Sequence, residues 1–284
     1  MFKLFLAFSL LAEELTKATK DFLDSDAKIN DKHEWLGIND AAMKGKGSSR
    51  RYYKFHTKKN IKIDGINTSI EHGIKIPVIS NLDYYHDGDL FGKQQNKIES
   101  DSKLDKFRVL KKTKDGYTTN VNGVLSPVLS SNKNGKWVET VDVIPLEHSK
   151  YTRNESIAAN NRMKNALSTS EFPNMSWEKI RSSLNSFNKL KHNNDHVLTD
   201  DQKNIVKNHP VGRVLADLLT HTNISVDDLS SENVGIWKHP ITGKDHPVIL
   251  DYGASKKLLS DYDDATDRYF NKEKPRVLNE VVLV

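Results

Sequence analysis

The sequence predicts an α+β protein in which a strand-rich part is followed by a helical part. From about residue 35 to 150, short apolar alternations are separated by Gly, Asn, Asp and Lys turns, a pattern typical of strands and hairpins. From about residue 151 onward, apolar residues recur at helical spacing. With 284 residues, 36% of them hydrophobic, the chain can bury a sizeable core. We expect an N-terminal helical extension over 1–34, a small strand-rich lobe over 35–150 and a reduced helical lobe over 151–284.

The composition excludes several classes of protein. The chain has no cysteine, which rules out disulfides, thiolate zinc sites and a cysteine nucleophile. No apolar run reaches the length that spans a membrane, so a cytoplasmic protein is expected. The 43 Lys and Arg residues exceed the 38 Asp and Glu residues, and the net charge of +5 favours anionic partners.

The N-terminus predicts an amphipathic helix at about 3–23. Six apolar residues at 4-3-4-3-4 spacing share one of its faces: Leu4, Phe8, Leu11, Leu15, Ala18 and Phe22. Leu10 stands two residues before Ala12, so the apolar stretch does not end in the small-x-small cleavage site of a signal peptide. The face docks on the body of the protein, on a protein partner or on a membrane surface, and the body is favoured.

Strands and one helix are expected before residue 150. The candidate strands are Tyr52–His56, Ile61–Ile63, Gly73–Ile79, Phe107–Leu110, Tyr117–Val121 and Trp137–Ile144. The helix is expected at about Lys93–Lys103, and loops at Asn81–Asp89 and Ser130–Gly135. Later helices are expected at about 155–168, 176–191, 200–208 and 211–221. Two short strands follow these helices, near Val234–Trp237 and Pro247–Leu250.

A basic stretch lies between Gly45 and Ile63. Seven basic residues precede the first acid, Asp64: Lys46, Arg50, Arg51, Lys54, Lys58, Lys59 and Lys62. Three aromatic residues are interleaved with them, Tyr52, Tyr53 and Phe55. This composition suits a phosphate, RNA or DNA ligand. A solvated basic hairpin is the equally supported alternative.

The segment Val226–Ser255 carries the clearest chemical pattern. Asp228 is followed five residues later by Asn233, and Asp251 follows the second of two short strands. A metal-bound triphosphate needs oxygen ligands for Mg²⁺ and a separate carboxylate near the hydroxyl that is phosphorylated. An acid and an amide on one loop, with a second acid after the returning strand, can converge on one pocket. Each motif alone is also typical of a turn or a cap.

These residues carry a resemblance to a known family. DLSSENVGI followed by DYG resembles the catalytic loop D-L-x-x-x-N and the D-F-G of the protein-kinase-like superfamily. The resemblance implies a two-lobe protein-kinase-like fold and an ATP- and Mg²⁺-dependent phosphotransferase. It implies that Asp228 orients or deprotonates the acceptor hydroxyl, on a protein or a small molecule, and that Asn233 and Asp251 hold Mg²⁺.

The beginning of the small lobe resembles the Gly-rich loop of a kinase. Gly45, Gly47, Ser48 and Ser49 precede the first candidate strand, and Arg50 stands at the usual third glycine. The resemblance implies that backbone amides and the two serine hydroxyls bind the phosphates of ATP.

A lysine and a glutamate complete the resemblance. His72-Gly73-Ile74-Lys75 is similar to V-A-I-K, which implies that Lys75 contacts the α- and β-phosphates. The following helix would supply the carboxylate that holds Lys75, with Glu99 as the choice and Asp101 as the alternative. An exposed strand lysine and a solvated helix face are the structural alternatives. Trp137–Leu146 would end in a hinge whose backbone faces adenine.

The sequence departs from an ordinary protein kinase at three points. Asp227 replaces the arginine before the catalytic aspartate, and Ser230 replaces a lysine that usually contacts the γ-phosphate. Positions 252–284 are too few for an activation segment and substrate-binding helices. The chain is therefore more similar to compact small-molecule kinases and to bacterial or phage kinase-like proteins. A non-catalytic kinase-like virion or assembly component, or a nucleic-acid-binding module using Arg50–Lys62, stays open.

Two histidine-containing clusters predict no metal site. His86-Asp87-Gly88-Asp89 lacks the acidic spacing of a calcium loop and indicates a turn. His192 and His196 stand four apart but frame a polar, turn-forming run, and the glutamate of a zinc-protease helix is absent.

Overall fold

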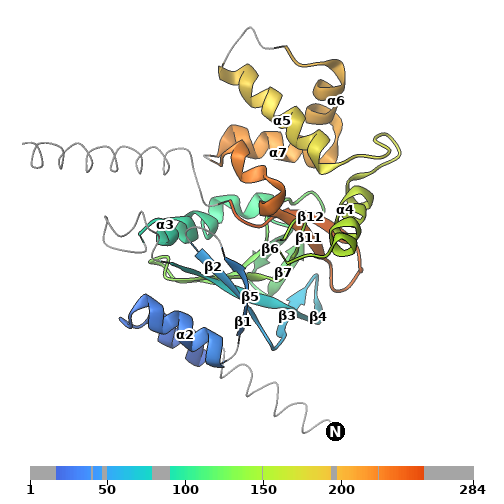
Figure 1. The fold of residues 1–284 in the computed structure, drawn as a ribbon. Helices are drawn as coiled ribbons and strands as arrows, with labels where there is room; N and C mark the ends of the chain where they lie inside the picture. The colour runs from blue at the N-terminus through green and yellow to red at the C-terminus, as the bar shows by residue number, and fades with distance from the viewer. Residues whose placement is uncertain are drawn as a thin grey trace, which may run out of the picture.

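Ten of the twelve strands that the structure describes lie before residue 146, and α-helices dominate after residue 152 (Figure 1). The computed structural model describes residues 17–39, 41–46, 50–78, 90–148, 150–192, 197–222 and 224–252. The predicted α+β class is confirmed in this part of the chain.

A five-stranded antiparallel sheet lies at the centre of the strand-rich part. Its strand order is β1 (Ala41–Lys46), β2 (Arg50–Phe55), β5 (His72–Pro77), β9 (Val138–Val141) and β8 (Val128–Ser131). Because side chains alternate along a strand, Ile74 and Ile76 point to one face of β5 and Lys75 to the other. Helix α3 (Leu90–Glu99) packs against β5 on the face that carries Lys75. The sheet thus separates the Lys75 side from an apolar side.

The N-terminal helices cover the apolar side. Residues 17–24 are helical, and Leu23 packs with Leu36 of α2 (Ile29–Asn39). Both leucines join a cluster with five residues of the sheet and its neighbouring turn: Tyr53, Phe55, Ile74, Ile76 and Trp137. For residues 17–24, docking on the body of the protein is confirmed. The predicted apolar face is wrong at Ala18, which is exposed, because the helix turns Thr19 and Leu23 toward the sheet.

A four-stranded sheet packs beside the central one. Its order is β4 (Ile66–Ile70), β3 (Lys59–Ile63), β7 (Gly116–Thr119) and β6 (Leu110–Thr113), with β3 and β7 parallel. Asp64 and Gly65 form the two-residue turn of the β3–β4 hairpin with φ of 49° and 83°. Asp-Gly is a typical pair for this turn because both positions require positive φ. Strand β4 was not among the expected strands, although this dipeptide signals it.

A third sheet joins the strand-rich and helical parts. It consists of β10 (Ile144–Pro145), β11 (Val234–Lys238) and β12 (Asp245–Ile249), all antiparallel. Strand β10 precedes the helices in the chain, whereas β11 and β12 follow them, so this sheet draws on both expected lobes. The two strands expected near residues 234 and 247 are confirmed.

Four helices form the part that precedes β11. They are α4 (Arg153–Leu167), α5 (Trp177–His192), α6 (Asp200–Asn208) and α7 (Pro210–His221), and α5, α6 and α7 lie together at one end of the molecule (Figure 1). Thr152 and Thr199 begin α4 and α6 with capping boxes, and Pro210 begins α7. All four expected helices are confirmed, and α6 has the expected bounds.

Several boundaries differ from the expectation. The expected helix at Lys93–Lys103 is α3, which ends at Glu99, and a 3₁₀ helix, η2 (Ser102–Phe107), follows it. Residues of η2 replace the start of the expected strand Phe107–Leu110, because Asp101 caps this turn. The expected loop Ser130–Gly135 is wrong at its start, since Ser130 and Ser131 belong to β8. The expected loop Asn81–Asp89 lies outside the described residues.

Within the ranges that the structure describes, no helix combines the length and apolar character required to cross a bilayer.

Candidate active site

Lys75 and Glu99 form a buried ion pair at the centre of the site. The Lys75 ammonium group lies 2.9 Å from Glu99 Oε1 and 3.0 Å from Oε2. It also donates to the backbone carbonyl of Leu250, just after β12. Glu99 is 1% exposed, and a carboxylate so buried requires charged or hydrogen-bonding partners. Three segments that are distant in the sequence therefore meet at the Lys75 ammonium group.

Helix α3 is held against the sheet by two sets of contacts. The Asn96 amide donates to the Gly135 carbonyl, at 2.9 Å, in the turn between β8 and β9. Gly135 has a φ of +76°, and a Cβ atom there would meet the Lys93 carbonyl oxygen at 2.1 Å, so glycine permits this close approach. Past the helix end, the Arg108 guanidinium donates to the Glu99 carbonyl. These contacts position the Glu99 carboxylate over the sheet.

The alternative carboxylate, Asp101, lies in a different environment. Its side chain is exposed and accepts a hydrogen bond from the Lys103 amide at 2.9 Å, which caps η2. The structure therefore brings Glu99, and not Asp101, to Lys75.

Arg50 is a second cation in the same cluster. The sequence analysis placed it in the basic stretch and at the third position of the Gly-rich loop, but assigned it no contact with Glu99 or Asp251. Its Nη2 lies 2.7 Å from Glu99 Oε1 and also donates to Asp251 Oδ1, while its Nη1 lies 3.1 Å from Asn96 Oδ1. Arg50 is 3% exposed. Burial opposes its charge, but Asp251 and Glu99 outweigh burial and raise the pKa of the guanidinium. Arg50 is therefore a permanent internal cation.

Asp251 lies at the open side of this cluster. Its side chain is 36% exposed, whereas that of Arg50 is buried. Burial of the carboxyl opposes its ionisation, but the positive charges of Arg50 and Lys75 outweigh that effect and hold the pKa of Asp251 below its usual value. A carboxylate is therefore the stable form of this side chain.

The chain brings Asn233 next to the segment that carries Asp251. Asn233 ends the short 3₁₀ helix η4 (Ser231–Asn233), and its carbonyl accepts from the Leu250 amide at 2.7 Å. This bond extends the β11–β12 ladder by one step. Tyr252 is buried in the core, with its hydroxyl 3.3 Å from the Ser126 carbonyl, so both sides of Asp251 are anchored.

The positions of Asp228 and of the Gly-rich segment are described in part. The backbone of Asp228 lies in the 3₁₀ helix η3 (Val226–Leu229), which the Trp177 indole anchors by donating to the Leu229 carbonyl at 3.0 Å. Gly45 lies in β1 opposite Tyr52 of β2. The Asp228 side chain and residues Gly47, Ser48, Ser49 and Gly253 lie outside what the structure describes.

The chemistry of Asn233 and Asp251 fits a magnesium ion shared with a nucleotide. They offer an amide and a carboxylate, and Mg²⁺ is usually bound through one or two carboxylates together with phosphate and water oxygens. Within the described ranges, no group of three or more His, Asp or Glu side chains is placed to hold a metal ion.

The basic stretch is divided between two sheets rather than forming one hairpin. Arg50 and Lys54 lie on β2 of the central sheet, whereas Lys59 lies on β3 of the neighbouring sheet. Each of these three residues contacts a carboxylate: Arg50 binds Glu99 and Asp251, Lys54 binds Glu71 and Asp142, and Lys59 binds Glu139. Part of the positive charge is therefore used inside the protein, and the solvated-hairpin interpretation is wrong for these residues.

A second buried carboxylate, Glu139, was also missed from the sequence. It is fully buried on β9 and lies 2.6 Å from Lys20, 2.8 Å from Lys59 and 2.8 Å from His72. Lys20 belongs to the N-terminal helix, so this cluster ties that helix to both neighbouring sheets. A glutamate at an inward position of an apolar strand is the signal that could have identified it.

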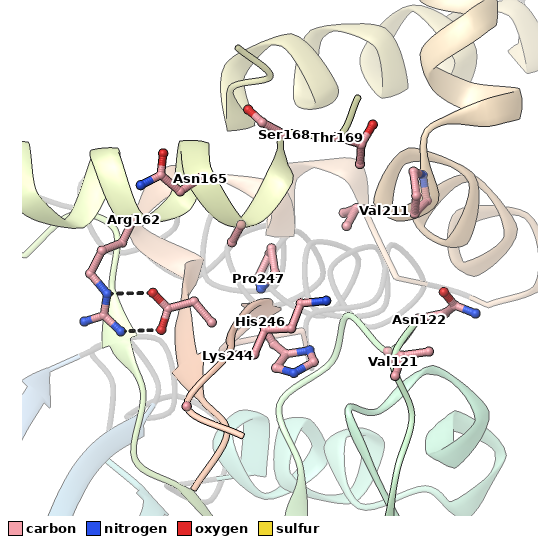
Figure 2. Close-up of a pocket in the computed structure, with 15 residues that line it drawn as sticks. Val121, Asn122, Arg162, Asn165, Ser168, Thr169, Val211, Lys244, His246 and Pro247 are labelled. Atoms are coloured by element: carbon pink, nitrogen blue, oxygen red, sulfur yellow. Dashed lines mark hydrogen bonds and ion pairs between the residues drawn. The ribbon is translucent and has the colours of Figure 1, made fainter. Parts of the chain in front are cut away.

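One cavity lies at the far end of strand β12 from Asp251. It encloses about 570 Å³ between the end of α4, the start of α7 and the β11–β12 turn. Figure 2 shows the bidentate ion pair of Arg162 and Asp245 at its edge, with Lys244, His246 and Pro247 beside it. None of the residues expected to act on a nucleotide lines this cavity.

The two histidine-containing clusters of the sequence cannot be compared with the prediction. His196, the side chain of His192 and residues 86–89 lie outside the described residues.

Comparison with known proteins gives no family for this chain. No protein-family model matches it, and no curated protein matches it. We therefore infer the function from the geometry of the site.

Proposed function

We propose that this chain is an ATP·Mg²⁺-dependent kinase-like phosphotransferase that moves a γ-phosphate to a hydroxyl acceptor. The observation that carries the proposal is the convergence of Lys75, Glu99 and Asp251 from a strand, a helix and the segment after a hairpin. Phosphoryl transfer depends on positioned cations and oxygen ligands rather than on covalent chemistry by the protein. A lysine held by a glutamate, beside an aspartate that stays ionised, meets that requirement.

Each residue has a definite role in the proposed site. Lys75 binds the α- and β-phosphates, and Glu99 holds Lys75 in place. Asn233 and Asp251 hold Mg²⁺, which neutralises phosphate charge when it is bound. Asp228 orients or deprotonates the acceptor hydroxyl.

We also propose that the fold is a two-lobe kinase-like fold, and the arrangement of its elements supports this. The central sheet presents Lys75 to α3, and the chain passes through β9 and β10 before it enters the helices. In the proposal, the Gly-rich segment from Gly45 to Ser49 covers the phosphates, and the backbone near Leu146 faces adenine.

A second candidate is a non-catalytic, kinase-like scaffold, for example a virion or assembly component. The contact between Arg50 and Asp251 favours this scaffold, because the Asp251 carboxylate already binds a cation of the protein. Ser230 at the position of a γ-phosphate lysine points the same way. A scaffold of this kind would bind ATP without transferring phosphate.

Thermal unfolding with ligands tests the proposed nucleotide site. ATP with Mg²⁺ is compared with AMP plus EDTA on the full-length protein. Ligand at about 100 times its dissociation constant stabilises the folded state by about 2.7 kcal/mol. We expect a higher melting temperature with ATP·Mg²⁺ than with AMP plus EDTA. Equal melting temperatures in the two conditions, at millimolar ATP·Mg²⁺, would contradict the proposed function.

A further inference from the structure

Arg50 balances the charge of the buried cluster around Lys75. Arg50 and Lys75 contribute two positive charges, and Glu99 and Asp251 contribute two negative charges, all joined by direct contacts. Without Arg50 the same cluster would carry one net negative charge. The positive charge of Arg50 thus offsets the negative charge of Asp251, which would otherwise attract a divalent cation.

Arg50 is also held firmly in its place. Its guanidinium reaches Asn96, Glu99 and Asp251 together, and Asn96 is itself fully buried and bound to Gly135. A planar guanidinium suits such a set of acceptors, and it keeps its charge at every pH at which the protein is folded. One oxygen of Asp251 is engaged in this contact.

From this geometry we infer that Arg50 competes with the divalent ion for Asp251 and so sets the metal affinity of the site. The inference rests on the proposed function, because that function makes Asp251 a metal ligand. A guanidinium in contact with a carboxylate weakens its attraction for a second cation, and a 2+ ion is repelled twice as strongly as a 1+ ion. The protein therefore binds the metal weakly by itself and more tightly together with the phosphates of a nucleotide.

Binding of Mn²⁺ alone, without nucleotide, tests this inference. Mn²⁺ prefers the same carboxylate and carbonyl ligands as Mg²⁺, and the loss of its free-ion EPR signal reports binding directly. Arg50→Gln removes the charge and keeps a polar side chain. We expect this variant to bind Mn²⁺ at least about tenfold more tightly than the wild type.

Arg51→Gln is the matched control. Arg51 is the next residue of β2 and faces the other side of the sheet, towards His33. Arg51→Gln changes the net charge of the protein by the same amount as Arg50→Gln. We expect Arg51→Gln to bind Mn²⁺ with the affinity of the wild type. Equal or weaker Mn²⁺ binding by Arg50→Gln, relative to Arg51→Gln, would overturn the inference. Adding Asp251→Asn to Arg50→Gln should remove the gain, and a gain that persists would also overturn it.

Arg50→Lys keeps the inference testable if Arg50→Gln fails to fold. Lysine retains a buried charge between the carboxylates but lacks the fork that reaches three acceptors at once. We expect Mn²⁺ binding about threefold tighter than in Arg51→Gln, and no gain would overturn the inference. The proposed function is judged separately, by ATP·Mg²⁺ binding to the wild type. A Mn²⁺ gain without any ATP binding would refute the phosphotransferase and leave the competition at Asp251 intact.

Discussion

Lys75 on β5 and Glu99 on α3 are 24 positions apart in the sequence and 2.9 Å apart in the structure. The same Glu99 oxygen also accepts from Arg50 at 2.7 Å, so one carboxylate serves two cations. Glu99 therefore has a second cationic partner that does not depend on Lys75. Glu99 keeps its ion pair with Arg50 if Lys75 is lost, and the site can therefore be probed at Lys75 without leaving this buried carboxylate unpaired.

Lys75→Met should lower ATP affinity by at least about tenfold while preserving the fold. A hydrogen bond to a charged group contributes about 1.5–3 kcal/mol, and methionine cannot make that bond to a phosphate. Calorimetric titration with ATP·Mg²⁺ measures the change. Lys62→Met, at an exposed position of β3, is the control and should bind as the wild type does. The same ATP affinity in both variants would remove Lys75 from the site.

Asp251→Asn should abolish the Mg²⁺ dependence of nucleotide binding. Asparagine keeps the size of the side chain but loses the negative charge that a divalent ion requires. ATP affinity is measured in Mg²⁺ and in EDTA, and the two values should become similar in the variant. Asp245→Asn, at the other end of β12, is the control. If Asp251→Asn lowers the melting temperature but leaves the Mg²⁺ dependence of ATP binding as it was, Asp251 has a structural role.

Glu139→Gln should destabilise the protein by about 3–5 kcal/mol. Removing one partner of a buried charge cluster leaves Lys20, Lys59 and His72 without their common carboxylate. Urea unfolding at pH 7 measures the loss, with Glu147→Gln at an exposed position as the control. A change below 1 kcal/mol would show that the cluster does not stabilise the fold.

The same cluster predicts a loss of stability in acid. Burial opposes ionisation of Glu139, but its contact with His72 and the charges of Lys59 and Lys20 outweigh burial and lower the pKa. The unfolded chain therefore takes up the proton first. This stabilisation is complete above the ordinary glutamate pKa of about 4.3 and is lost as the pH falls below it. Between pH 5 and pH 3, the free energy of unfolding should fall more steeply in the wild type than in Glu139→Gln.

His33 predicts a second dependence on pH, nearer neutrality. Its ring nitrogens lie 2.8 Å from the Tyr53 hydroxyl and 3.0 Å from the Pro77 carbonyl oxygen. Burial, together with the charge of Arg51, lowers the pKa of His33 to about 4. The unfolded chain binds the proton near pH 6.5, so stability present above that pH is lost as the pH falls toward 4.

The His33 contribution can be measured by urea unfolding at pH 7 and pH 5. Protonation of His33 in the unfolded chain should lower the free energy of unfolding of the wild type by about 2 kcal/mol between pH 7 and pH 5. His33→Gln should lack this part of the pH dependence. His56→Gln, at an exposed position, should retain it. Equal pH dependence in the wild type and His33→Gln would exclude this cause.

Local patterns predicted most elements of the fold. The start of α6 follows from Thr199 and Gln202, which form a capping box within four residues of sequence. Strand β8 was missed because Val128–Ser131 is short and leads into a turn rich in Asn, Gly and Lys. The N-terminal face was misassigned at Ala18 because periodicity alone does not reveal which side of a helix meets the sheet.

The candidate site was less predictable than the fold. Lys75 and Glu99 were chosen from a resemblance, and the structure brings them together. Arg50 could not be chosen, because its partners Glu99 and Asp251 are 49 and 201 positions away. A basic residue at a strand start looks solvated until the long-range contacts are known. The burial of Glu139 could have been inferred from its inward strand position, but not its partner Lys20, which lies 119 positions away.

The most direct test of phosphoryl transfer is the turnover of γ-labelled ATP by the wild type and by Asp228→Ala. In the proposed site Asp228 acts on the acceptor and not on the nucleotide, so ATP affinity should stay within about twofold in the variant. Loss of a general base typically lowers the rate by about 10² to 10⁴. Asp227→Ala, the neighbouring residue of η3, is the control and should turn over as the wild type does.

Autophosphorylation or phosphate release in the presence of Mg²⁺ supplies the readout. We expect turnover by the wild type and by Asp227→Ala, with a rate at least about 100 times lower for Asp228→Ala at unchanged ATP affinity. Binding of ATP without turnover in any of the three proteins would favour the scaffold instead. Equal turnover by the wild type and Asp228→Ala would contradict the catalytic assignment.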